Sequence, residues 1–549
     1  MKLAISPHGH EIDTVVGEVR AASAPYAVSI QARTVYVALG MLALFGCYAY
    51  ALPATLGDAA IYFPYFKNFF DVPFSYQPNH VSYGATSALH VVVFSVVYRA
   101  FGADWLLAAK VINFLFVVAG LFLLYRSARL PAAYFPLMCV AACAFEALLV
   151  SVAQLFETGL VFFSMSLWLF WLRADRTKWA IVLAGALPLV RPELALLSGV
   201  LFCDLVVRRR QTRWLPVFAL SAVPVALYAG YMAIAGAGVL PASVLSRALR
   251  SLEPSASWTT RLSQTFAQLD DEQPAYAFGL AVLLLFLLRQ RARAHWEWIA
   301  AGPVLALYLL LPPGPYLARY LTPILPVVIL SGALLAHEVL SSSALPGPMR
   351  RNAKVASQVI LVLLVAAAIH TYWSQRLTFQ RYDVGTWLLT DLSQELNARA
   401  TADDRILIYE IQGQYSLNGY AISVDGTVGN DVQPVLLGRE TTSDFITRAG
   451  VRFVVTSNSF AYRKIFAHSV LADLYGFDLG SAVGDEVTLD GLTFRKILTN
   501  PYFADPSLHV LQRASDLNVG ETLRTYGPRT PSWYHYQILW NSVYDVRPQ

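Results

Sequence analysis

Charged residues are scarce in this chain of 549 residues. Asp, Glu, Lys and Arg make up only 14% of it, against about 25% in typical soluble proteins. The mean hydropathy is +0.48. This deficit argues against a single soluble domain, a disordered chain or a nucleic-acid-binding protein. It favours a polytopic membrane protein that is embedded in, and interacts with, the lipid bilayer.

Cysteine and the common cofactor motifs are also nearly absent. The four cysteines (Cys47, Cys139, Cys143 and Cys203) all lie in apolar runs, so the chain is not a disulfide scaffold. There is no phosphate-binding loop, no dinucleotide fingerprint and no Cys-x-x-Cys pair. The missing nucleotide motifs disfavour a nucleotide-driven pump. His80 and His90 lack the spacing of zinc ligands, which disfavours a histidine metal site.

Long apolar runs fill the first two thirds of the chain. A spanning helix needs about 20 apolar residues to cross about 30 Å of hydrocarbon. Eleven runs are candidates, at about 35–52, 106–125, 132–150, 157–173, 179–190, 194–207, 214–236, 275–289, 296–311, 321–340 and 355–373. We predict eleven transmembrane helices in residues 1–373, with residues 1–33 as a cytoplasmic N-terminus and 91–101 as a juxtamembrane helix.

Basic residues predict the orientation. Clusters of Lys and Arg occur in five of the connecting loops, at 126–129, 173–178, 208–213, 289–293 and 350–354. With eleven spans all five loops fall on the same side, which the positive-inside rule makes cytoplasmic. The first loop (53–105) and everything after residue 373 then face the periplasm.

The last part of the chain differs in charge from the rest. Residues 374–549 hold 15 basic and 19 acidic side chains, whereas residues 1–373 hold 26 and 17. Helical and strand patterns alternate there, with β-branched runs at 405–410 and 451–456. We therefore predict a soluble, periplasmic α/β domain over residues 374–549.

A polar, aromatic segment follows the first span. Asp58 precedes Tyr62, Tyr65, Lys67 and Asn68, which recur near helical spacing. This pattern predicts a short amphipathic helix on the outer face, with Asp58 near its positive N-terminal end. Asp58 either takes part in the chemistry of a site or serves only as an N-cap.

A second outward segment, 76–90, carries His80, Tyr83 and Thr86. Its polar and aromatic side chains either line a substrate groove or form an ordinary surface loop.

Charged residues recur at the outward ends of later spans. They are Glu146 and Glu157, the Arg191-Pro192-Glu193 turn, and Arg319 with Tyr320. Arginine binds phosphate through two parallel hydrogen bonds, and a carboxylate accepts the proton of an attacking hydroxyl. These residues either bind a lipid-linked phosphate substrate in a water-filled outer cavity, or they pair with each other and only hold helices together.

At these positions the chain resembles the GT-C superfamily of integral-membrane glycosyltransferases, and within it the mycobacterial-type arabinofuranosyltransferases. The matches are Asp58-Ala59, Ile61, Tyr65, Lys67-Asn68, Tyr76, Pro78, Val81, Gly84, Thr86-Ser87, Leu89, Glu157-Thr158, Arg191-Pro192-Glu193, Arg319-Tyr320 and Pro323, with further likeness at 382–388, 410–415 and 425–426. Where the family has a second acid and an arginine, this chain has Gly57 and Pro64. Asp58 is then the only local candidate base.

The resemblance implies that the donor is a polyprenyl-phosphate sugar, and that the transferred sugar is an arabinofuranose or another pentose. It also implies inversion at the anomeric carbon. Asp58 would be the catalytic base. Tyr62, Tyr65, Lys67, Asn68, His80, Tyr83, Thr86, Glu157, Arg191, Glu193, Arg319 and Tyr320 would bind substrate. The acceptor would be a cell-envelope glycan, lipid or protein, at the periplasmic face of a bacterial inner membrane. We expect no metal ion and no cofactor.

Two other functions fit the same sequence features. A transporter or flippase of a lipid-linked sugar would use the same charged residues, although the sequence shows no inverted repeat. A membrane scaffold would use the tail to recruit a partner.

Overall fold

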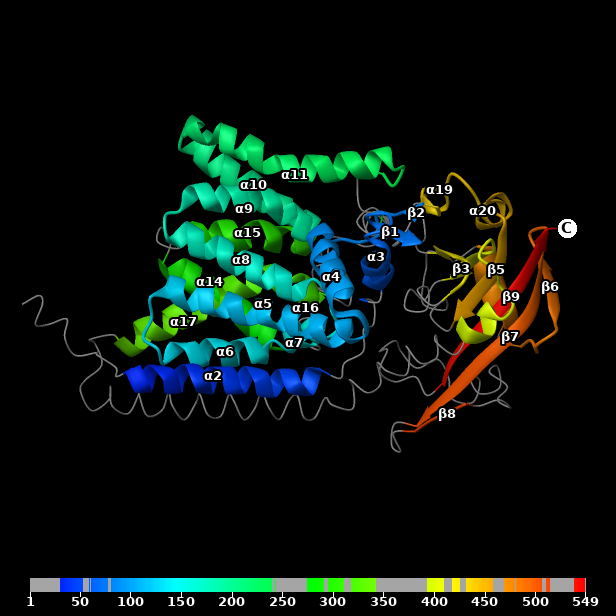
Figure 1. The fold of residues 1–549 in the computed structure, drawn as a ribbon, viewed down its shortest axis with the longest axis horizontal. Helices are drawn as coiled ribbons and strands as arrows, with labels where there is room; N and C mark the ends of the chain where they lie inside the picture. Colours follow the sequence, from blue (N-terminus) through cyan, green and yellow to red (C-terminus); the bar gives the residue numbers. More distant parts are fainter. Residues whose placement is uncertain are drawn as a thin grey trace, which may run out of the picture.

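The protein has a body of long helices and a β-rich tail, with the tail at one end of the body (Figure 1). The computed structural model describes residues 30–52, 59, 61–77, 80–238, 242, 274–290, 295–310, 317–341, 393–408, 417–424, 431–457, 469–478, 480–505, 510–513 and 538–548. Asp58, most of the predicted cytoplasmic N-terminus and the predicted span at 355–373 lie outside these residues.

Apolar helices occupy the described part of the body, at or near the ranges that the sequence predicted. They are α2 (Ile30–Ala51), α4 (Ala88–Phe101), α5 (Trp105–Ala128), α6 (Tyr134–Ala144), α7 (Glu146–Ala153), α8 (Thr158–Arg173), α9 (Thr177–Val190), α10 (Ala195–Phe202), α11 (Leu215–Ile234), α14 (Pro274–Gln290), α15 (His295–Leu310) and α17 (Leu325–Ser341). Shorter elements join them: α3 (Tyr62–Asn68), α16 (Leu317–Tyr320), the 3₁₀ turns η2 (Gly102–Asp104), η3 (Pro192–Leu194), η5 (Thr212–Trp214) and η7 (Thr322–Ile324), and the π-helical turn η4 (Cys203–Arg208).

Three helical stretches in the described residues are long and apolar enough to cross a bilayer. They are Arg33–Ala51, Ala88–Ala128 and Thr212–Ile234, with mean hydropathies of 1.6, 2.3 and 1.8. The bent pair α6 and α7 makes a fourth if it is counted as one span. The total of eleven spans stays a prediction.

The predicted single span at 132–150 is wrong in one respect, because the chain bends by 74° between α6 and α7. Phe145 stands at the bend with non-helical dihedral angles (φ −88°, ψ 77°). The bend puts Glu146 in the first turn of α7, where the helix dipole favours a carboxylate. A straight helix would instead have held that carboxylate in mid-span.

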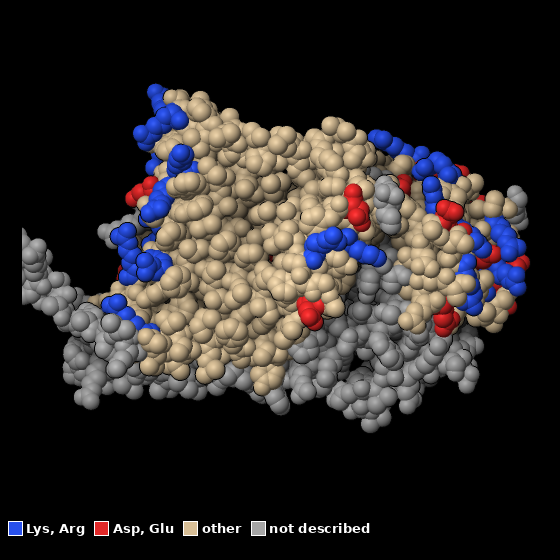
Figure 2. All heavy atoms as spheres, in the orientation of Figure 1, with Lys and Arg blue, Asp and Glu red and all other residues tan. Residues whose placement is uncertain are grey.

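Basic residues gather at one end of the body. Figure 2 shows Lys and Arg along the edge that faces away from the tail, and an uncharged belt between that edge and the tail. Contacts between helix ends assemble this edge: Arg173 at the end of α8 pairs with Glu297 at the start of α15, and Arg209 pairs with Asp204 at 2.9 Å. This is the charge distribution that the positive-inside rule associates with a cytoplasmic face.

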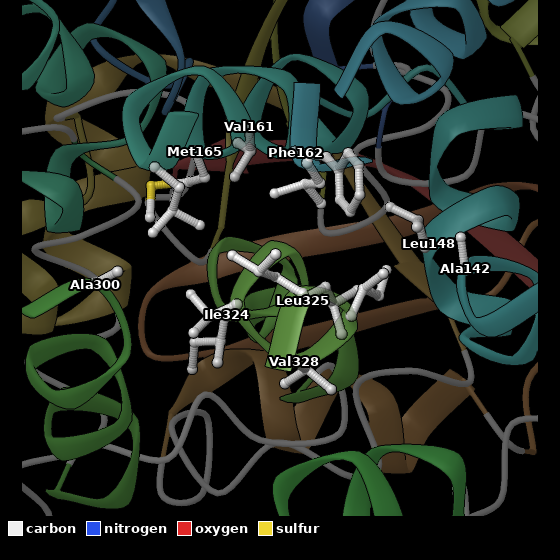
Figure 3. Packing of buried hydrophobic residues seen from close by; sticks show 14 of the residues in the cluster. Ala142, Leu148, Val161, Phe162, Met165, Ala300, Ile324, Leu325 and Val328 are labelled. Carbon is white, nitrogen blue, oxygen red and sulfur yellow. The ribbon is translucent and has the colours of Figure 1, made fainter. Parts of the chain in front are cut away.

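The body is packed around α8. Figure 3 shows Val161, Phe162 and Met165 of α8 facing Ile324 and Leu325, where η7 leads into α17. Phe162, Met165 and Ile324 are at most 1% exposed. This dry packing holds both ends of α8 in place, including the end that carries Glu157.

The tail is built on a mixed seven-stranded sheet in the order β4-β3-β5-β9-β7-β6, with β8 paired to β7. Its strands are β3 (Arg405–Ile408), β4 (Tyr420–Ser423), β5 (Val451–Ser457), β6 (Glu486–Leu489), β7 (Leu492–Asp505), β8 (Val510–Arg513) and β9 (Ile538–Pro548). β3 runs parallel to β4 and β5, and the remaining pairs are antiparallel. The helices α19 (Gln433–Leu436), α20 (Thr442–Ala449) and α21 (Val470–Asp478) accompany it.

A small hairpin joins the body to the tail. It consists of β1 (Ser75–Gln77) and β2 (His80–Val81) and follows α3. Gln77 donates a hydrogen bond to the Ala421 carbonyl at 3.1 Å, and the ring of His80 meets Tyr420 edge-on at 5.1 Å. Both contacts reach β4, so this strand lies against the hairpin. The hairpin, α3 and the residues that lead into α4 form the outer segment of the body.

Candidate functional site

A polar cluster lies at the end of the body opposite the basic edge. α8 carries Arg173 at its basic end and Glu157, its N-cap residue, at the other. α9 ends at Val190, and Arg191 then turns into extended backbone (φ −155°, ψ 133°) before Pro192 starts η3. The Pro therefore ends one helix and aims Arg191 and Glu193 at the start of α8.

Arg191 lies between two carboxylates. Its Nη1 is 3.5 Å from Oε1 of Glu157, and its Nε is 2.5 Å from Oε1 of Glu193. The Arg191 side chain is only 4% exposed. A buried charge of this kind must be paired, because desolvation would otherwise cost several kcal/mol.

Glu157 receives a second contact from the outer segment. The Tyr62 hydroxyl of α3 donates a hydrogen bond to Oε2 of Glu157 at 3.0 Å and lies 2.9 Å from the Thr86 hydroxyl. Three predicted site residues, far apart in the sequence, therefore meet at one point.

Arg319 and Tyr320 complete the cluster from α16. The Arg191 guanidinium carbon is 4.7 Å from the centre of the Tyr320 ring, and that of Arg319 is 5.3 Å from it. Arg319 also lies over the ring of Phe156, at 4.1 Å. These are cation–π distances, and they bring two guanidinium groups close to one aromatic ring.

The sequence did not single out Tyr308 of α15 as a site residue. Its hydroxyl donates a hydrogen bond to Oε1 of Glu193 at 2.6 Å. The available hint was its position near the outward end of a predicted span, which by itself is too common to identify a site residue.

Two further buried polar residues support the cluster. His90 is fully buried, with Nε2 3.1 Å from the Leu155 carbonyl and its ring 4.8 Å from that of Tyr62. Asn113 of α5 donates hydrogen bonds to the carbonyls of Val152 and Phe156, at 3.0 and 2.9 Å. Together they fix the turn between α7 and α8 from which Glu157 projects.

Other predicted residues have structural contacts outside the cluster. Tyr65 donates a hydrogen bond to Ser82 at 3.2 Å, and burial raises the pKa of Tyr65 to about 12. Asn68 binds the hairpin through the carbonyls of Ser75 and Tyr76, at 3.4 and 3.3 Å.

The remaining three predicted binding residues lie elsewhere in the outer segment. Lys67 is exposed at the end of α3. His80 and Tyr83 line a cavity between the body and the tail. Of the predicted binding residues, the cluster thus contains Tyr62, Thr86, Glu157, Arg191, Glu193, Arg319 and Tyr320.

The charges of the cluster balance. Two guanidinium groups face two carboxylates, with tyrosine hydroxyls as further donors. Arg191 is in contact with both carboxylates, and Arg319 lies over the ring of Phe156 and donates a hydrogen bond to the Tyr320 hydroxyl. Within the described residues, no three His, Cys, Asp or Glu side chains are grouped so as to hold a metal ion.

Several solved structures are similar to this chain, and two of them are described here. No protein-family model matches the chain, and no curated protein does. ArnT from Cupriavidus metallidurans bound to undecaprenyl phosphate is 16% identical, with a TM-score of 0.47, over 78% of this chain and 93% of that one. The apo state of ArnT is 15% identical, with a TM-score of 0.43, over 78% of this chain and 94% of that one. A likeness at this level assigns neither a fold nor an activity to this chain.

Proposed function

We propose that the chain is a GT-C-type membrane glycosyltransferase that moves a sugar from a polyprenyl-phosphate donor to a cell-envelope acceptor. One observation carries the proposal: residues from four separate motifs of the sequence resemblance, among them Thr86, Glu157 and Arg191, meet in one buried polar cluster, where Tyr62 links Thr86 to Glu157. Ion pairs that only held helices together would have no reason to lie at the positions that resemble a glycosyltransferase.

The orientation follows from the basic edge of the body. If that edge faces the cytoplasm, the cluster and the tail face the periplasm of a bacterial inner membrane. The donor lipid would then lie in the outer leaflet, with its phosphate at the depth of the cluster.

The proposed reaction is a single displacement. Asp58, four residues before Tyr62 in the sequence, removes the proton of the acceptor hydroxyl. The acceptor oxygen attacks the anomeric carbon as the bond from that carbon to the phosphate oxygen breaks. The polyprenyl phosphate leaves with the bonding electrons, and the sugar inverts at the anomeric carbon.

Negative charge grows on the leaving phosphate during this step, so a cation in its vicinity lowers the barrier. We assign this role to Arg319, whose guanidinium lies in the cluster beside the Tyr320 ring. Arg191 instead pairs with Glu157 and Glu193 and holds them in position. For this one residue, the ion pairs support the alternative that it only holds helices together. Lys67, exposed on α3, is a second candidate for the phosphate.

We take an arabinofuranose or another pentose as the best candidate for the transferred sugar, on the sequence resemblance alone. A hexose or an aminopentose is the variant to test beside it, because Gly57 and Pro64 depart from the arabinofuranosyltransferase pattern.

The test uses the full chain in lipid nanodiscs with a synthetic polyprenyl-phosphate pentose and candidate acceptors. We expect a glycosidic product with the wild type and none with Asp58→Asn. Asp71→Asn is the matched control, since Asp71 is an exposed acid in the same outer segment. Full turnover by Asp58→Asn would remove Asp58 as the base.

The bend between α6 and α7 favours a second candidate, because broken helices are common in transporters. This candidate is a flippase for the same lipid-linked sugar. In proteoliposomes, movement of the labelled donor across the bilayer without any glycosidic product would favour the flippase over the transferase.

A further inference from the structure

A cavity of about 620 Å³ lies between the body and the tail. Its volume is within the range of about 300–1,000 Å³ that small-molecule sites occupy. Its lining residues are His80, Val81, Ser82, Tyr83, Ala235, Gly236, Ala237, Asp431, Pro434, Arg439, Glu440 and Arg448.

The two walls of the cavity differ in chemistry. The body wall comes from the hairpin segment and the end of α11, and Tyr83 is backed by Tyr228 at a ring distance of 5.2 Å. The tail wall comes from Asp431 just before α19, from α19 and α20, and from the connection between them, and it supplies every acid and arginine of the lining. Figure 1 shows α19 and α20 next to the β1–β2 hairpin. A largely apolar wall that includes the Tyr83 ring, facing a wall of planar polar groups, suits a molecule with apolar faces and many hydroxyls.

The charges of the tail wall cancel. Arg448 donates two hydrogen bonds to Glu440, at 2.7 and 2.9 Å, so its charge is already matched. The remaining cation, Arg439, is offset by Asp431, which accepts a weak hydrogen bond from Tyr420 at 3.4 Å. A site for a polyanion would leave several cations unmatched. The balance favours a neutral ligand.

The body wall is bonded to the helix that carries Tyr62. The Tyr65 hydroxyl of α3 donates to Ser82 at 3.2 Å and accepts from the Gly84 amide at 3.0 Å. Three residues after Tyr83, Thr86 lies 2.9 Å from the Tyr62 hydroxyl. The residues from Tyr83 to Thr86 can extend by only about 3.3–3.6 Å each, so the cavity wall begins within about 11 Å of the cluster.

We propose that this cavity binds the acceptor, and that the acceptor is recognised there as an uncharged saccharide. Asp431 and Arg439 bind sugar hydroxyls, and Tyr83 contacts a sugar face. The proposal rests on the proposed glycosyltransferase function and adds the acceptor class and the tail residues that select it.

The test measures binding, so that it is independent of turnover. The full chain in nanodiscs is titrated calorimetrically with an octyl arabinofuranose disaccharide. We expect Asp431→Asn and Arg439→Gln each to weaken binding about tenfold, because each removes a charge-assisted hydrogen bond. Arg495→Gln is the matched control: Arg495 is half exposed on β7 and pairs with Glu486, and we expect its substitution to leave the affinity unchanged.

Two results would overturn the proposal. One is wild-type affinity for the disaccharide in both Asp431→Asn and Arg439→Gln. The other is displacement of the disaccharide by inorganic phosphate, which would make the cavity an anion site. Release of free sugar from the donor by the wild type without the saccharide tests the glycosyltransferase function separately, because water then attacks the anomeric carbon in place of the acceptor hydroxyl.

Discussion

The Tyr62 hydroxyl donates a hydrogen bond to Oε2 of Glu157 at 3.0 Å, across 95 residues of sequence. This bond ties the outer helix α3 to the N-cap of α8. It therefore couples α3 to the ion pairs of Arg191.

Replacing Tyr62 by Phe removes this hydrogen bond and leaves the ring. We expect the free energy of unfolding to fall by about 1.5–3 kcal/mol, the usual value for a hydrogen bond to a charged group, and the turnover to fall with it. Thermal unfolding in detergent and the transfer assay measure the two effects. Tyr98→Phe is the control, because the Tyr98 ring packs on Trp105 in the same outer part of the body. Equal losses in both variants would contradict a specific role for the bond.

Replacing Arg191 by Met leaves the buried Glu157 and the partly buried Glu193 without their shared cation. We expect the unfolding free energy to fall by about 3–5 kcal/mol, because breaking a buried pair leaves uncompensated charge. Adding Glu157→Gln and Glu193→Gln to the same chain should restore part of that loss. For comparison, Arg495→Met breaks an exposed pair and should cost at most about 1 kcal/mol. Wild-type stability of Arg191→Met would show that the pairs do not hold the cluster.

Gly159 permits the close contact between α5 and α8. A Cβ atom at this position would lie 2.3 Å from the Asn113 carbonyl oxygen and 2.4 Å from its Oδ1. We expect Gly159→Ala to destabilise the protein by about 1–3 kcal/mol, since backbone must move. Gly46→Ala is the control, as its Cβ would meet nothing within 4 Å. Similar unfolding temperatures for both variants would contradict the close packing.

Acid should loosen the parallel strands of the tail. Partial burial raises the pKa of Asp404, but hydrogen bonds from Thr401 and Arg452 outweigh it and hold that pKa below its ordinary value. A depressed pKa contributes stability above the unfolded value of about 3.9, and this stability is lost as the pH falls through the folded value. Hydrogen exchange of the β3 and β5 amides should therefore speed up at low pH in the wild type.

The same exchange experiment has two comparison variants. Arg452→Gln should show a smaller acid effect, because it removes one of the hydrogen bonds that depress the Asp404 pKa. Asp403→Asn, at the exposed neighbouring residue, should keep the wild-type effect. An acid effect of wild-type size in Arg452→Gln would rule out this origin.

Much of the body could be predicted because helix formation in apolar runs is a local property. The predicted ranges 157–173 and 275–289 correspond to α8 (Thr158–Arg173) and α14 (Pro274–Gln290). The bend at Phe145 escaped prediction because no Pro or Gly marks it; neighbouring helices decide where such a bend lies. Likewise Tyr308 could not be singled out, because its partner Glu193 lies 115 residues away in the sequence.

By itself the sequence determined that apolar helices dominate the chain, that basic residues gather at one end of them, and that certain tyrosines, acids and arginines stand at helix ends. These properties depend only on the length of each apolar run and on the order of residues along the chain, so they can be read from each segment by itself. Only the tertiary structure decided that Arg191 lies between Glu157 and Glu193 while Arg319 stacks on Phe156. Such pairings depend on which helix ends pack together, and that is settled by the shape of the whole buried core.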